Sequence, residues 1–278
     1  MPGTLYIVAT PIGNLDDITL RALRVLKEVD VVAAEDTRHT QVLLNHYGIQ
    51  TPLTSYHEHN ERTKAEDLVK RLLKGQDIAL VSDAGTPAIS DPGLRLVAQA
   101  VDAGIRIIPL PGASALTAVL SAAGLPTDRI AFEGFLPAKK KQRRQKLQAL
   151  RDEARTLVFY EAPHRLAEAL DDIYELLGDR KTVLAREVSK VHEEFLRGRI
   201  SELIRVLQRR EIRGEFTVVV SGSTGETPVT EDRLKAEIHE LHLRGMRVKE
   251  IAEVLGEKFG YPKKEIYRLA MVGRRISS

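Results

Sequence analysis

Short runs of apolar residues alternate with amphipathic segments along the first 110 residues of the chain. The apolar runs, residues 5–9, 30–34, 78–81 and 106–110, carry almost no polar side chain, which is typical of strands buried on both faces. Residues 19–28, 64–74 and 94–103 show helical spacing, and a glycine directly follows each of the last two segments. Strands that alternate with helices predict an α/β fold, with a mostly parallel sheet covered on both faces.

A second alternating set follows an uncharged stretch, residues 107–127. That stretch is long enough to span a membrane, but its prolines, glycines and small residues favour a buried turn and helix. After it, the sequence predicts strands over 130–135, 156–160, 182–186 and 216–220 and helices over 142–152, 166–177 and 200–210. A chain of 278 residues is long enough for two such units.

The domain organisation follows from these elements. We expect an N-terminal α/β domain over residues 1–115 and a second α/β domain over 116–222. Residues 222–228 have the composition of a linker, and 231–243, 249–259 and 263–272 read as short helices. Residues 223–278 are therefore predicted to be a linker and a small helical C-terminal extension.

Composition excludes several kinds of protein. The chain has no cysteine, so it has no disulfide, no thiolate nucleophile and no zinc site that depends on sulfur. It lacks the basic segment and apolar core of a signal peptide at its start, so we expect a cytoplasmic protein without a membrane segment. No H-E-x-x-H spacing or nucleophile elbow is present, and we expect no metal site.

The loops after the predicted strands are where a ligand would bind in an open α/β sheet. Residues 10–14, Thr-Pro-Ile-Gly-Asn, match neither the dinucleotide fingerprint nor the phosphate loop. Residues 82–93, Ser-Asp-Ala-Gly-Thr-Pro-Ala-Ile-Ser-Asp-Pro-Gly, are small, polar and turn-forming, so they predict a tight loop whose backbone can grip a ligand. Residues 111–114 start a helix whose first N–H groups lack helical partners.

Charged residues offer further candidates. Residues 35–38, Glu-Asp-Thr-Arg, follow the second strand and are either a helix cap with an ion pair or part of a site. Net charge is only +3, yet residues 139–146 hold six basic side chains and no acid. This stretch is either a solvated helix face or a binding site for a polyanion such as RNA.

Four segments, 5–15, 34–38, 82–93 and 159–165, resemble the tetrapyrrole methylase superfamily, and within it the branch that methylates ribosomal RNA. The similarity extends to about residue 222, and the helical end resembles that branch's helix-turn-helix-like extension. The resemblance implies a two-domain fold with S-adenosylmethionine in a cleft between the domains, a homodimer, and methylation of a cytidine ribose 2′-hydroxyl in small-subunit (16S) ribosomal RNA. Tetrapyrrole-specific relatives have a glycine-rich first loop, which this chain lacks.

The resemblance and the loop pattern together nominate site residues. The candidate cofactor-binding residues are Pro11, Asp83, Gly85, Thr86, Pro87, Ile89, Ser90, Ser114, Ala115, Tyr160 and Glu161. Asp36 and Lys190 are candidate catalytic groups that would act on the 2′-hydroxyl, or else members of structural ion pairs. The candidate RNA-binding residues are Arg38, Lys139, Lys140, Lys141, Arg143 and Arg144.

Two other functions remain open from sequence. A methyltransferase for a small molecule such as a tetrapyrrole would share the cofactor loops but would not need the basic stretch. A non-catalytic RNA-binding protein would need the basic stretch but not the loop at 82–93. The sequence has both features, which favours an enzyme that acts on ribosomal RNA, either free or in the assembled small subunit.

Overall fold

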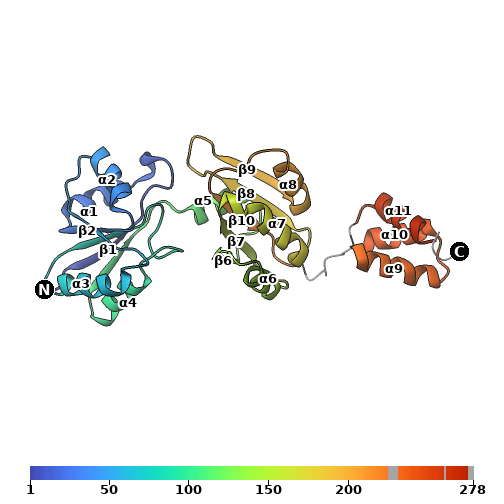
Figure 1. Cartoon of the computed structure of the whole chain (residues 1–278), viewed down its shortest axis with the longest axis horizontal. Coiled ribbons are helices and arrows are strands. Elements are labelled where there is room, and N and C mark those ends of the chain that lie inside the picture. Colours follow the sequence, from blue (N-terminus) through green and yellow to red (C-terminus); the bar gives the residue numbers. More distant parts are fainter. Residues whose placement is uncertain (225–230, 260, 275–278) are drawn as a thin grey trace.

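The computed structural model describes residues 1–224, 231–259 and 261–274 and contains two α/β units followed by a group of helices (Figure 1). The first unit is built on a five-stranded sheet of order β3-β2-β4-β1-β5, in which every neighbouring pair is parallel. Its strands are β1 (Thr4–Val8), β2 (Val31–Ala34), β3 (Leu53–Ser55), β4 (Ile78–Val81) and β5 (Arg106–Leu110). The predicted parallel sheet is therefore confirmed for this unit.

Helices cover both faces of the first sheet. They are α1 (Leu20–Glu28), α2 (Thr37–His46), α3 (Glu61–Leu73) and α4 (Leu94–Asp102), with a short 3₁₀ turn at Leu15–Asp17. Leu26 and Leu44, from α1 and α2, pack on one face, whereas Leu68 and Leu96, from α3 and α4, pack on the other. The sequence analysis did not predict α2 or β3.

The second unit contains a mixed sheet of order β6-β7-β10-β8-β9. The strands are β6 (Ile130–Phe135), β7 (Thr156–Glu161), β8 (Lys181–Arg186), β9 (Glu194–Arg199) and β10 (Phe216–Val220). β6 and β7 are parallel, but β10 runs antiparallel to β7 and β8, and β9 runs antiparallel to β8. The alternation of strands and helices thus did not specify strand direction here, and β9 was not predicted.

The helices of this unit lie on the two faces of the mixed sheet. They are α5 (Ala115–Ala123), α6 (Lys140–Ala149), α7 (Pro163–Leu177) and α8 (Ile200–Leu207). Val119 and Leu120 of α5 pack against Val158 and Val219 of the sheet, and α6, α7 and α8 share the other core. Because α5 packs on the second sheet, we propose that the boundary between the two domains lies near residue 115.

The C-terminal helices α9 (Glu231–Leu243), α10 (Val248–Phe259) and α11 (Lys263–Arg274) bury a small core of their own around Leu234, Ile251 and Ile266. This confirms the predicted helical extension. The predicted linker over residues 222–228 lies largely outside the described residues. Within the described part of the chain, no helix combines the length and the apolar character that crossing a membrane requires.

Candidate active site

Three loops of the first unit meet beyond the carboxyl ends of its strands. Thr10, after β1, and Gly85, after β4, exchange backbone N–H···O bonds of 2.9 and 3.0 Å. The Thr86 hydroxyl donates to the Ala113 carbonyl at 3.3 Å, which joins the β4 loop to the segment before α5. The structure therefore brings Pro11, Gly85, Thr86 and Ser114 together, as the sequence predicted for residues that hold one ligand.

The β4 loop, residues 82–93, has an unusual backbone. Gly85 has a φ of +82°, and the non-glycine residues Ala88 and Ser90 have φ of +67° and +65°. Non-glycine residues in this region cost free energy and persist where the surroundings fix them, often at ligand sites. Here the Thr10 hydroxyl donates to the Ser82 carbonyl at 3.0 Å, which connects the start of this loop to the loop after β1.

Residues of the second unit approach this loop from β6 and β7. A Cβ on Gly134 would lie 2.9 Å from the Ser90 hydroxyl oxygen, so the Ser90 side chain packs closely against the Gly134 backbone. Burial raises the pKa of the Tyr160 hydroxyl, and the nearby Leu116 backbone, in the first turn of α5, opposes this effect. Phe132 and Phe135 place ring edges against Tyr160, with centroids 5.0 and 5.6 Å away. Ser90, Ala115 and Tyr160 therefore lie at the junction of the two units.

Three carboxyl groups gather at the same strand ends. The Asp83 carboxylate accepts the Asp36 backbone N–H at 2.9 Å. Burial and the nearby Glu35 charge raise the pKa of Asp91 to about 6, and burial and Asp83 raise the pKa of Glu35. The sequence analysis placed Glu35 and Asp91 in loops after strands but did not single them out. For Glu35, the position directly after the buried strand β2 could have indicated a site residue.

The two candidate catalytic groups are both members of ion pairs. Asp36 caps α2 through the Arg38 backbone N–H, and the Arg38 guanidinium 2.7 Å away holds the pKa of this carboxyl well below its usual range. The Lys190 ammonium lies 2.9 Å from Glu187 and 3.0 Å from Glu215. Although burial lowers the pKa of Lys190, these carboxylates raise it overall. Neither group is suited to accept a proton at neutral pH.

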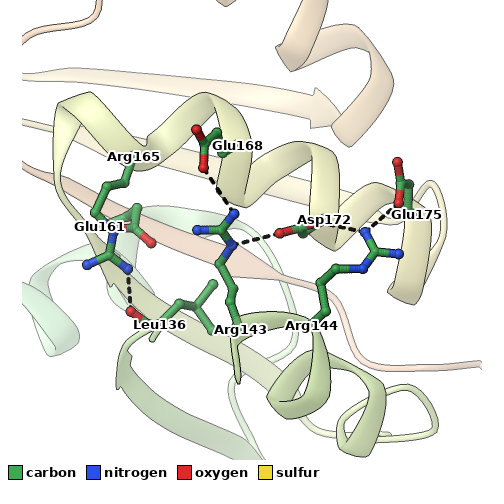
Figure 2. Close-up of polar contacts among 8 residues, drawn as sticks. All are labelled: Leu136, Arg143, Arg144, Glu161, Arg165, Glu168, Asp172 and Glu175. Atoms are coloured by element: carbon green, nitrogen blue, oxygen red, sulfur yellow. Dashed lines mark hydrogen bonds and ion pairs between the residues drawn. The ribbon is translucent and has the colours of Figure 1, made fainter. Parts of the chain in front are cut away.

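Glu161 lies at the end of β7 but does not present a free carboxylate to the site. Its side chain is buried, and one oxygen accepts the Ala162 N–H at 3.0 Å and faces Arg165 at 3.3 Å. Burial raises the pKa of this carboxyl. Arg165 in turn donates to the Leu136 carbonyl, just before α6 (Figure 2). In this structure the Glu161 carboxyl group therefore links β7 to α7, and contact of Glu161 with the cofactor stays a prediction.

The basic stretch divides into buried and exposed members. Arg143 is 1 % exposed, and its guanidinium contacts Asp172 at 2.7 Å and Glu168 at 3.2 Å (Figure 2). The prediction that Arg143 binds RNA is therefore wrong, because a buried, paired guanidinium cannot reach a phosphate. Arg144 is partly exposed and contacts Asp172 and Glu175 at 2.6 and 2.5 Å.

The rest of the predicted RNA surface remains open to solvent. Lys139, Lys140 and Lys141 are exposed at the start of α6, and Arg38 keeps 90 % of its side chain exposed beside Asp36. Asp83, Pro87 and Ile89 lie in the β4 loop, where Ile89 is exposed. Among residues 1–224, 231–259 and 261–274, no three His, Asp or Glu side chains are arranged to hold a metal ion.

The class of protein to which this two-unit fold belongs is a family of methylases. Residues 4–204 match the family model of Tetrapyrrole (Corrin/Porphyrin) Methylases, and the chain belongs to this family. It is similar in fold to the crystal structure of uroporphyrin-III-C-methyltransferase from Thermus thermophilus. The TM-score is 0.58 at 22 % sequence identity, over 80 % of this chain and 96 % of that one.

Two relatives are much more similar in sequence. Both carry the name Ribosomal RNA small subunit methyltransferase I. The protein from Pseudomonas aeruginosa is 51 % identical over 275 residues, covering 97 % of each chain. The protein from Halalkalibacterium halodurans is 49 % identical over 272 residues, covering 96 % of this chain and 94 % of the relative. The predictions of a methyltransferase and of S-adenosylmethionine as its methyl donor are confirmed.

Proposed function

We propose that this protein transfers a methyl group from S-adenosylmethionine to the ribose 2′-hydroxyl of a cytidine in small-subunit ribosomal RNA. The observation that carries the proposal is the near-complete, roughly half-identical alignment with relatives named for that RNA. We further propose that the protein works in the cytoplasm as a homodimer, on ribosomal RNA or the assembled small subunit.

The residues at the junction of the two units fit the methyl donor. Gly85 has a φ of +82°, which favours glycine, and a Cβ there would reach ordinary contact with Ile12 Cγ2 at 3.4 Å and the Ala113 carbonyl at 3.8 Å. This open backbone, the loop residues Pro11, Asp83, Thr86, Pro87, Ile89 and Ser90, and Ser114, Ala115 and Tyr160 would hold the adenosine and methionine parts. The Glu161 carboxyl group, which is buried and faces Arg165, would not contact the cofactor directly.

S-adenosylmethionine supplies an electrophilic methyl group on a sulfonium, and its transfer is an in-line displacement. The chain's own task is therefore to align the hydroxyl with the methyl group and to exclude water. The Ala88 and Ser90 backbone is held in one strained conformation, so the loop is organised before a ligand binds. Lys139, Lys140 and Lys141, together with Arg38, would contact RNA phosphates.

Mass mapping of small-subunit ribosomal RNA tests the proposal. RNA from cells that lack this protein, incubated with the purified enzyme and S-adenosylmethionine, should gain one methyl group on a cytidine-containing fragment. Free RNA and intact subunits, tested separately, identify the form that the enzyme accepts. Resistance of the modified linkage to alkali places the methyl group on the 2′-oxygen. RNA that stays unmodified in both forms, with methyl transfer to a tetrapyrrole instead, would overturn the proposal.

A further inference from the structure

Two loops from different α/β units contact each other beside the candidate active site. One is the β1 loop, residues 10–17, and the other is the β8 loop, residues 187–193, which we call the clasp. The Lys190 stem lies so close to Gly13 that a Cβ on Gly13 would overlap Lys190 Cγ and approach its backbone nitrogen to 3.3 Å. The Ser189 hydroxyl also contacts the Asp17 carboxylate.

The clasp is fixed by its own polar groups. Glu187 and Ser189 have φ of +50° and +68°, an unfavourable region for non-glycine residues. The Lys190 ammonium contacts Glu187 and Glu215, and the Ser189 N–H donates to the Glu193 carboxylate at 2.7 Å. Because the ammonium pairs with two carboxylates of the second unit, the methylene stem of Lys190 is the part that contacts the first unit.

The surface that receives this stem belongs to the methyl-donor site. Gly13 is three residues from Thr10, which pairs with Gly85 through two backbone hydrogen bonds. The neighbouring Ile12 side chain faces Gly85 as well. A displacement of the backbone at Gly13 therefore acts on the same loops that would hold the cofactor.

We infer that Lys190 is a positioning residue: its stem packs on the bare backbone of Gly13 and holds the two loops together over the methyl-donor site. This inference rests on the proposed function, since it assigns a role within that site. It replaces the role of proton acceptor that the sequence suggested for Lys190, whose ammonium is engaged by two carboxylates. It also gives a reason for glycine at position 13, whose φ any residue can adopt.

A double-mutant cycle tests the contact from both sides, with binding of S-adenosylmethionine measured by calorimetry on the full chain. Gly13→Ala should raise the Kd about tenfold, as expected for a coupled contact pair. Lys190→Ala should weaken binding too. Once the stem is gone, adding Gly13→Ala to Lys190→Ala should change the Kd by less than about twofold. Additive effects of the two substitutions, or no effect of either, would overturn the inference.

Two further variants separate this role from others. Gly48→Ala introduces a Cβ at a φ of +62° with no neighbouring atom within 4 Å, so it should lower the melting temperature without changing the Kd. Lys190→Arg keeps both a stem and a cation, so kcat should stay within about threefold, whereas a proton acceptor would be lost because arginine stays protonated.

The outcomes also distinguish a failure of the positioning role of Lys190 from a failure of the proposed function. If the wild-type protein binds S-adenosylmethionine and the cycle is non-additive while ribosomal RNA is not methylated, the proposed function is wrong and the positioning role of Lys190 is supported. If ribosomal RNA is methylated and the cycle is additive, the proposed function is supported and the positioning role of Lys190 is wrong. A kcat that falls more than about a hundredfold in Lys190→Arg with an unchanged Kd would restore the role in proton transfer.

Discussion

Replacing Arg143 with methionine should destabilise the second α/β unit. The guanidinium of Arg143 is buried between α6 and α7, 2.7 Å from Asp172 and 3.2 Å from Glu168. Breaking a buried pair costs about 3–5 kcal/mol, because a charge is left without its partner. Asp172 retains Arg144 at 2.6 Å, so we expect the low end of that range, about 3 kcal/mol.

Thermal and urea denaturation, followed by circular dichroism, measure this loss. A loss of about 3 kcal/mol corresponds to a fall of roughly 12–15 °C in the melting temperature for a unit of about 100 residues. Adding Asp172→Leu should recover most of the lost stability, since an apolar pair of similar volume often replaces a buried ion pair without cost. Lys140→Met, an exposed position on the same helix, is the matched control and should melt like the parent.

The same variant tests whether Arg143 contacts RNA. Folded Arg143→Met, assayed below its melting temperature, should bind RNA with an unchanged dependence of affinity on salt. A melting temperature equal to that of the parent would refute the structural role. A salt slope that falls by about 0.7, the value for one lost phosphate contact on a single strand, would show that the guanidinium reaches RNA after all.

Three other predictions concern the site and the surface. Changing Lys139, Lys140 and Lys141 together to glutamine should reduce the salt slope of RNA binding by about 2, at roughly 0.7 per contact, and leave cofactor binding unchanged; an unaltered slope would mean that RNA binds elsewhere. Gly85→Val places a β-branched residue at a φ of +82° and should weaken S-adenosylmethionine binding at least about tenfold in calorimetry, with an unchanged circular dichroism spectrum; wild-type affinity would contradict the assigned loop. Because folding raises the pKa of Asp91 from 3.8 to about 6, the folded state binds its proton more tightly, and stability falls as pH rises through that window. Asp91→Asn should therefore raise the melting temperature at pH 7.5 and lose that advantage below about pH 4; a stabilisation that persists at low pH would rule out this electrostatic cause.

Elements whose own residues determine their structure, such as strands buried on both faces, were predictable from the sequence. The apolar runs gave four strands of the first sheet nearly to the residue, because strands buried on both faces tolerate few polar side chains. β9 was missed because Glu194–Arg199 is an edge strand with charged residues at both ends and no clear alternation. The reversed direction of β10 was not predictable either, since the sequence of a strand does not record which neighbours it pairs with.

The burial of Arg143, within the basic stretch, could have been predicted from helical periodicity, although the count of basic residues did not show it. Arg143 lies four residues before Leu147, on the buried face of α6, and its partner Asp172 lies on the buried face of α7 next to Ile173. A charged residue at a core position of one helix and an opposite charge at a core position of the next indicate a buried pair. Helical periodicity therefore carries information about an arginine that composition alone does not.

The contact between Gly13 and Lys190 is of a different kind, because neither residue has a local pattern that indicates the other. They lie in separate units, each with its own buried core, and only the way the units come together makes them neighbours. Among the described residues, the non-glycine residues with positive φ are Ala88 and Ser90 in one unit and Glu187 and Ser189 in the other, and they lie in loops at this junction. The two cores supply the stability that offsets such strain, so the loops can be shaped for the ligand rather than for folding.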